Sequence, residues 1–146
     1  MTATVADIDA LLRTRDWKFS EMPVSQHVLE AARERMNWNL PQGLINLYQL
    51  GDRGEGSLRN QPWNFVLWGI QNVADLRNHV HYQSYYPDFL FFGGNGAGEY
   101  FGLDRQGQVF FMDPIAGEDS IIVSSKSMDE FIANLGLAPV GLDGPR

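Results

Sequence analysis

Cysteine is absent from the 146 residues, which excludes disulfide bonds and thiolate metal sites. No apolar run approaches the about 20 residues that a membrane helix needs, and the N-terminus lacks the basic and apolar segments of a signal peptide. Positive charge is scarce: 11 Lys and Arg face 18 Asp and Glu, and the resulting net charge of −7 repels phosphate backbones and anionic lipids. We therefore predict a cytoplasmic protein that binds neither nucleic acid directly nor membranes.

The size and composition indicate one folded unit. The mass of 16.5 kDa falls in the usual range of one domain, and 44% hydrophobic residues supply enough apolar material for a core. From position 138 to the end, two prolines and two glycines stand among nine residues without periodicity. We predict a single domain over residues 1–136 and a loose C-terminal tail over residues 137–146.

Helical patterns occupy the N-terminal third. Thr4 and Ser25 each precede apolar residues at helical spacing, and Leu40-Pro41 opens a third such stretch. Gly51–Ser57 combines three glycines with charge and is predicted to be an exposed loop. A strand at residues 65–68 and a helix capped by Asn72 are expected to follow.

Strand patterns dominate the second half. Apolar runs at residues 89–92, 99–103, 109–112 and 120–124 are separated by glycine-containing turns. Ser127 and Glu130 then form a capping box for a last helix. The order predicts an α+β fold: a mainly antiparallel sheet of about four to six strands, on which helices from the N-terminal third and the C-terminus pack.

An ordered set of motifs resembles the SUKH superfamily, which is named partly for fungal cell-wall assembly regulators and known mostly from bacterial immunity proteins beside polymorphic toxins. The set comprises Leu40-Pro41 with Tyr48, the glycine-rich stretch from Gly51, the run from Phe91 to Asp104 with its glycine-rich turn, and further matches at Gly107-Gln108-Val109, Asp113, Ser124-Ser125, Met128, Phe131 and Leu135. The resemblance covers roughly residues 40–135 and carries no catalytic motif.

The resemblance implies a domain with a cleft for protein contacts, and it orders three hypotheses. The first is a non-enzymatic immunity protein that binds and neutralises a toxin. The alternative is a regulatory scaffold module that binds endogenous proteins. The third is a small hydrolase using Glu99 or Asp104, although five residues apart on a strand these carboxylates point to opposite faces. Partner identity and oligomeric state are left open.

Cofactor and metal sites find little support in the sequence. The turn Gly94–Gly98 lacks the G-x-G-x-x-G spacing of a dinucleotide site and leads into a strand where such a site opens a helix. His79 and His81 stand in a helical pattern that splays them apart. We predict no cofactor and no bound metal.

Partner-binding candidates are aromatic and acidic residues in expected loops and turns. Trp63, Tyr85 and Tyr86 adjoin prolines in polar surroundings and are the expected anchors, beside Asn95 and Glu99 of the hairpin. Acidic side chains are expected to steer a cationic toxin, because toxins that act on nucleic acids carry positive charge to hold phosphate. These are Asp52 and Glu55 in the predicted Gly51–Ser57 loop, and Glu118 and Asp119 after Pro114.

Overall fold

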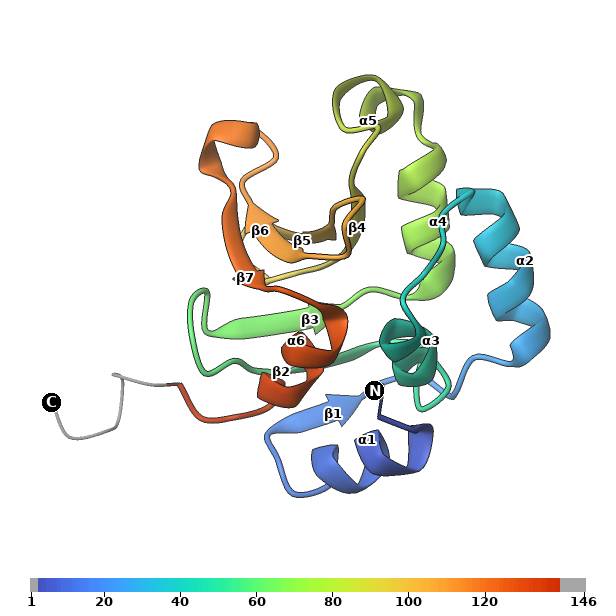
Figure 1. Ribbon diagram of the computed structural model, residues 1–146, viewed down its shortest axis with the longest axis vertical. Coiled ribbons are helices and arrows are strands. Elements are labelled where there is room, and N and C mark those ends of the chain that lie inside the picture. The colour runs from blue at the N-terminus through green and yellow to red at the C-terminus, as the bar shows by residue number, and fades with distance from the viewer. Residues whose placement is uncertain (1–2, 140–146) are drawn as a thin grey trace, which may run out of the picture.

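The computed structural model describes residues 3–139 as a seven-stranded sheet accompanied by six α-helices (Figure 1). The helices are α1 (Val5–Leu12), α2 (Gln26–Met36), α3 (Gln42–Tyr48), α4 (Ile70–Asn78), α5 (Val80–Tyr85) and α6 (Met128–Asn134), with a 3-10 turn η1 (Glu118–Ser120). The strands are β1 (Trp17–Phe19), β2 (Gly54–Ser57), β3 (Asn64–Leu67), β4 (Leu90–Gly94), β5 (Tyr100–Leu103), β6 (Val109–Met112) and β7 (Ile122–Ser125).

The sheet is an antiparallel meander. Its strands lie in the order β1 to β7, so every strand pairs with its neighbour in the chain. The predicted α+β class with a mainly antiparallel sheet is confirmed. The sheet has one strand more than the upper end of the predicted range.

The predicted loop over Gly51–Ser57 is wrong for its second half, which is strand β2. Gly54 and Gly56 are buried and pair with Phe19 and Trp17 of β1. A Cβ on Gly54 would lie 2.4 Å from the Trp17 ring, and one on Gly56 would lie 2.2 Å from the carbonyl oxygen of Asp16. The glycines therefore allow close approach of a neighbouring strand, and in this segment they do not indicate an exposed loop.

Alternation along the strands separates two apolar clusters. Leu90 and Phe92 of β4 join the main core, where the Phe65, Phe101 and Phe131 rings meet edge to face or tilted at 4.9–5.5 Å. This contact places α6 on that face of the sheet. The alternate residues Phe91, Phe110 and Met112 form a second cluster on the other side with residues of α4, α5 and the loops.

Three of the four predicted side-chain N-caps are confirmed, and of the capping box predicted at α6 the Ser127 half is present. Thr4, Ser25 and Ser127 accept from the backbone amides of Asp7, Val28 and Glu130. The predicted cap at Asn72 is wrong, because α4 begins at Ile70, whose amide donates to the Asp52 carboxylate at 2.8 Å. Asp52 is thus half-buried and fixed, contrary to its predicted place on an exposed mobile loop.

Two segments project beyond one end of the sheet. Figure 1 shows α5 on one side and the β6–β7 connection (residues 113–121), which contains η1, on the other, with strands β4–β6 between them. Of the predicted C-terminal tail, residues 140–146 lie outside the described part of the chain. The carbonyl oxygen of Leu137, at the start of that tail, accepts from the Ser57 hydroxyl.

Candidate functional site

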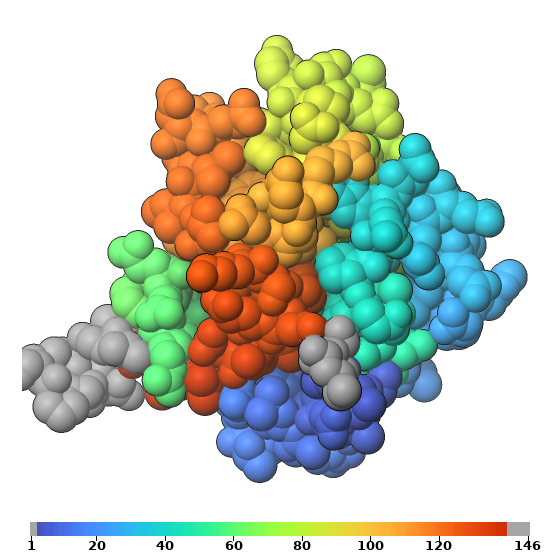
Figure 2. Space-filling model, viewed as in Figure 1, coloured from blue at the N-terminus to red at the C-terminus, as the bar shows by residue number. Residues whose placement is uncertain are grey.

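A groove lined by four tyrosines lies between the two raised segments, and we name it the tyrosine groove. Tyr82, Tyr85 and Tyr86 come from α5 and its end, Tyr100 from β5, and Pro114 to Gly117 close the opposite side. Its volume is about 700 Å³, within the range of about 300–1,000 Å³ that is usual for ligand pockets. Figure 2 shows the corresponding notch between the lobe of α5 and the lobe of the β6–β7 connection.

The second apolar cluster holds Tyr82, Tyr86 and Tyr100 in place. The Tyr82 ring lies 5.9 Å from Phe91 and 6.4 Å from Tyr100, to which it is nearly parallel. The Tyr86 ring packs on Phe91 at 5.5 Å, and its hydroxyl donates to the Pro114 carbonyl at 2.9 Å. The Tyr82 and Tyr86 rings are therefore packed, and the Tyr86 hydroxyl is bonded to a residue of the groove wall.

Burial raises the pKa of two of the groove tyrosines, Tyr82 and Tyr86. It raises the pKa of Tyr82, with a further contribution from the hydrogen bond to Tyr100. It also raises the pKa of Tyr86, and the negative charges of Glu118 and Asp113 add to this effect. The two carboxylates therefore act on the groove although they are not part of its walls.

A smaller hollow of about 280 Å³, named the Trp63 hollow, lies on the other side of the β4–β5 turn (residues 95–99). Its walls include Pro62, Trp63, Asn95, Glu99 and Ile122. Trp63 has a left-handed backbone (φ 74°), which is unusual for a residue with a bulky side chain. Both hollows thus border the same two chain segments, the β4–β5 turn and the stretch from Pro114 to Ile122.

Hydrogen bonds link the polar residues beside the Trp63 hollow. The side-chain amide of Asn64 donates to the Glu55 carboxylate and to the Asn95 carbonyl, and the Asn95 amide donates to Glu99 at 3.0 Å. The Asn95 side-chain oxygen also accepts from the backbone amides of Ala97 and Glu99. Asn95 and Glu99 therefore hold the turn as well as facing the hollow.

Apolar side chains are exposed around both hollows. Ile115 is 96% exposed at the tip of the β6–β7 connection, and Ile122 and Val123 are about half exposed on β7. β7 is the last strand in the sheet order, so it lies at an edge. Glu118 and Asp119 lie exposed between these residues, and neither forms an ion pair with any residue of 3–139. Apolar and aromatic groups with charge at the rim are typical of protein-binding surfaces.

A family model for the SMI1/KNR4 family (SUKH-1) matches residues 23–134. The chain belongs to this family. The predicted membership of the SUKH superfamily is thereby confirmed, and the match begins at residue 23, so that it includes α2 as well as the motifs from residue 40 onward. A comparison with curated proteins finds no significant match.

In this SUKH chain the predicted site residues do not gather in one place. Tyr85 and Tyr86 line the tyrosine groove, whereas Trp63, Asn95 and Glu99 line the Trp63 hollow. Glu118 and Asp119 lie on the chain segment that joins the two, and Glu55 is linked to the second hollow through Asn64. Asp52 lines neither and caps α4.

Sequence reasoning missed several residues of this surface, among them Tyr82, Tyr100, Ile115 and Ile122. Tyr82 stands four residues before Tyr86, a helical spacing that places both side chains on one face. Ile115 stands between Pro114 and Ala116-Gly117, and a large apolar residue in a turn is itself a signal of exposure. Tyr100 and Ile122 gave no such signal, since both belong to ordinary strand patterns.

The arrangement offers no paired catalytic carboxylates around Glu99 and Asp104. Asp104 lies just beyond the far end of β5, where it accepts from the amides of Gln106 and Gln108, while Glu99 lies before its start. Within residues 3–139 no group of three or more His, Asp or Glu side chains is arranged to hold a metal ion. None of the helices in this part of the chain has the length and apolar composition to span a membrane.

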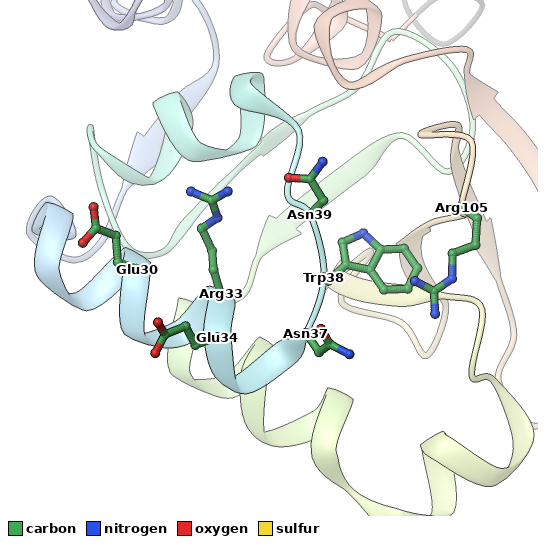
Figure 3. A pocket seen from close by; sticks show the side chains of 7 residues that line it. All are labelled: Glu30, Arg33, Glu34, Asn37, Trp38, Asn39 and Arg105. Atoms are coloured by element: carbon green, nitrogen blue, oxygen red, sulfur yellow. The ribbon is translucent and has the colours of Figure 1, made fainter.

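A further hollow of about 700 Å³, named the Trp38 hollow, borders α2 and the β5–β6 turn (Figure 3). The Arg105 guanidinium lies over the Trp38 ring at 4.2 Å, and Arg77 lies at 5.2 Å from the same ring. Trp38 is itself buried. These cation–π contacts tie the chain after α2 to α4 and to the β5–β6 turn, a structural role.

Proposed function

We propose that this SUKH protein is a non-catalytic, cytoplasmic immunity protein that binds a cationic protein toxin and blocks it. The observation that carries the proposal is the tyrosine groove, whose wall includes the exposed Ile115 and Gly117, the residue directly before the acidic turn η1. Aromatic anchors beside exposed carboxylates fit a basic partner, because the rings supply contact area while the charges guide association. Family membership supports the proposal at a coarser level.

The experiment begins with a search of the adjacent genes for a secreted toxin candidate, and a co-expression assay with that candidate follows. We expect the protein to restore growth of cells that express the candidate, and the two proteins to co-elute in size-exclusion chromatography. A Tyr85→Ala/Ile115→Asp double variant should lose both effects, because both residues line the tyrosine groove. It should still fold, since the two side chains are 65% and 96% exposed and their replacement leaves the core unchanged. Met22→Asp, at a position that is 82% exposed outside both hollows, is the matched control.

Three outcomes would contradict the proposal. Growth inhibition that persists when the protein is present in excess would remove the immunity role. Selective binding of endogenous cellular proteins that is lost in the same double variant would instead support the regulatory scaffold hypothesis. Hydrolytic activity lost on Glu99→Gln or Asp104→Asn would favour the third hypothesis.

A further inference from the structure

The tyrosine groove combines aromatic faces with unpaired negative charge, and this combination suits a particular side chain. Lys and Arg are absent from its walls, and the one basic-type residue that lines it within residues 3–139 is His81. The Tyr82 and Tyr100 rings lie within 30° of parallel, and Tyr85 is 65% exposed beside them. The faces of such rings attract a cation that lies over them.

The acidic side of the groove is the β6–β7 connection. Glu118 follows Gly117, which lines the groove, and its negative charge adds to the burial that raises the pKa of Tyr86. Asp113 contributes as well, although one of its oxygens already accepts from the amides of Ile115 and Ala116. Glu118 is exposed and forms no ion pair within the described residues, so its carboxylate is available to a cation from outside.

We propose that the tyrosine groove receives an arginine side chain of the protein partner, with the guanidinium stacked on tyrosine rings and paired with Glu118. A guanidinium is planar, stacks on aromatic rings and donates two parallel hydrogen bonds to a carboxylate, whereas an ammonium group is a compact, strongly hydrated charge. The inference deepens the proposed function and rests on it only for the existence of a partner protein.

The groove can be tested without a partner. N-acetyl-arginine methylamide and its neutral isostere N-acetyl-citrulline methylamide would be titrated into the ¹⁵N-labelled full chain at low ionic strength and followed by NMR. We expect the arginine probe to shift the amide signals of Gly98, Gly117 and the residues of α5, and the citrulline probe to bind about five- to tenfold more weakly. N-acetyl-lysine methylamide should fall between the two.

Variants then assign the contacts. Glu118→Gln should weaken the arginine probe several-fold and leave the citrulline probe unchanged, and Tyr85→Ala should weaken both. Glu21→Gln, the same loss of charge at an exposed position outside the groove, is the matched control. Thermal unfolding of each variant checks that the fold persists, which is expected since all three side chains are exposed.

Equal affinity for arginine and citrulline, tighter binding of lysine, shifts centred outside the groove, or indifference to Glu118→Gln would each overturn the inference. Its failure is distinguishable from failure of the proposed function. If a toxin binds but its affinity ignores Glu118→Gln and Tyr85→Ala, the arginine contact is wrong and the immunity role stands. If the arginine probe binds the groove but no protein rescues or co-elutes, the proposed function fails alone.

Discussion

Trp63 combines an uncommon backbone with a place in the wall of a hollow. A φ of 74° costs an L-amino acid free energy that glycine avoids, and such strain persists where the surrounding structure enforces it, often at functional sites. The backbone amide and carbonyl of Trp63 both bond within the β2–β3 connection, to Asn60 and Leu58. These contacts fix the residue and present its ring to the Trp63 hollow.

Two substitutions at Trp63 separate strain from packing. Both Trp63→Gly and Trp63→Ala remove the ring, but only glycine relieves the positive φ. We expect Trp63→Gly to be more stable than Trp63→Ala by about 1 kcal/mol in urea denaturation. Equal stability of the two variants would show that the backbone at this position carries no strain.

Two glycines of the β4–β5 hairpin should respond to alanine for different reasons. Gly98 has φ 102° with open space where a Cβ would lie, so Gly98→Ala should cost about 1 kcal/mol through backbone conformation alone. Gly93 has an ordinary φ, but a Cβ there would lie 2.4 Å from the Val66 carbonyl oxygen and 2.5 Å from the Phe65 ring. Gly93→Ala should therefore cost clearly more, at or above the about 1–3 kcal/mol of overpacking. Denaturation midpoints of both variants decide this, and the reverse order would contradict it.

At the scale of elements, α6 depends on the residue that caps its N-terminus. Ser127 accepts from the Glu130 amide at 3.1 Å, and Phe131 and Ile132 of the same helix are buried against the sheet. Ser127→Ala should lower the free energy of unfolding by roughly 0.5–2 kcal/mol, as at other N-caps. Partner binding should be unchanged, because Ser127 lines neither the tyrosine groove nor the Trp63 hollow. Ser127→Asp, which retains an acceptor, is the matched control.

Sequence patterns predicted those helices and strands whose hydrophobic pattern and capping residues match their packing in the fold. The strands from residue 89 onward are alternating or continuous apolar runs between turns that contain glycine. Ser127 was predicted to cap the last helix, and it is the N-cap of α6. β2 could not be predicted, since Gly54 and Gly56 have low strand propensity and are explained only by the Trp17 ring of another strand. The candidate site was only partly predictable for the same reason. Tyr100 and Ile122 lie at the hollows because of how their strands pair in the sheet, which the local sequence does not indicate.

At the scale of the whole molecule, three tyrosines make stability sensitive to alkaline pH. Burial raises the pKa of Tyr48, whose hydroxyl donates to the Trp68 carbonyl, as well as those of Tyr82 and Tyr86. Above about pH 10 the unfolded chain releases these protons while the folded chain retains them. The free energy of unfolding must then fall as pH rises, and the stabilising effect is complete only below the unfolded pKa.

Urea midpoints measured from pH 8 to pH 11 test this expectation. The wild type should lose stability steadily above about pH 10, and the slope should be shallower for Tyr48→Phe and Tyr86→Phe. Tyr85→Phe, at the exposed position of the same groove, is the matched control. A slope that is identical in all four proteins would contradict the assignment.

The strand order bears on how the chain reaches its native state. Because each strand pairs with its neighbour in sequence, the sheet contains no crossover, and it can grow by adding one strand at a time to an existing hairpin. Folding rates fall as contacting residues become more distant in the chain, since the entropy of closing a long loop is lost before the contact forms. The separations between β4, β5, β6 and β7 are short, whereas 34 residues lie between the end of β1 at Phe19 and the start of β2 at Gly54, and these include α2 and α3. Strands β4 to β7, among them the β5 strand that supplies Tyr100 to the tyrosine groove, can therefore assemble early, before the first strand docks.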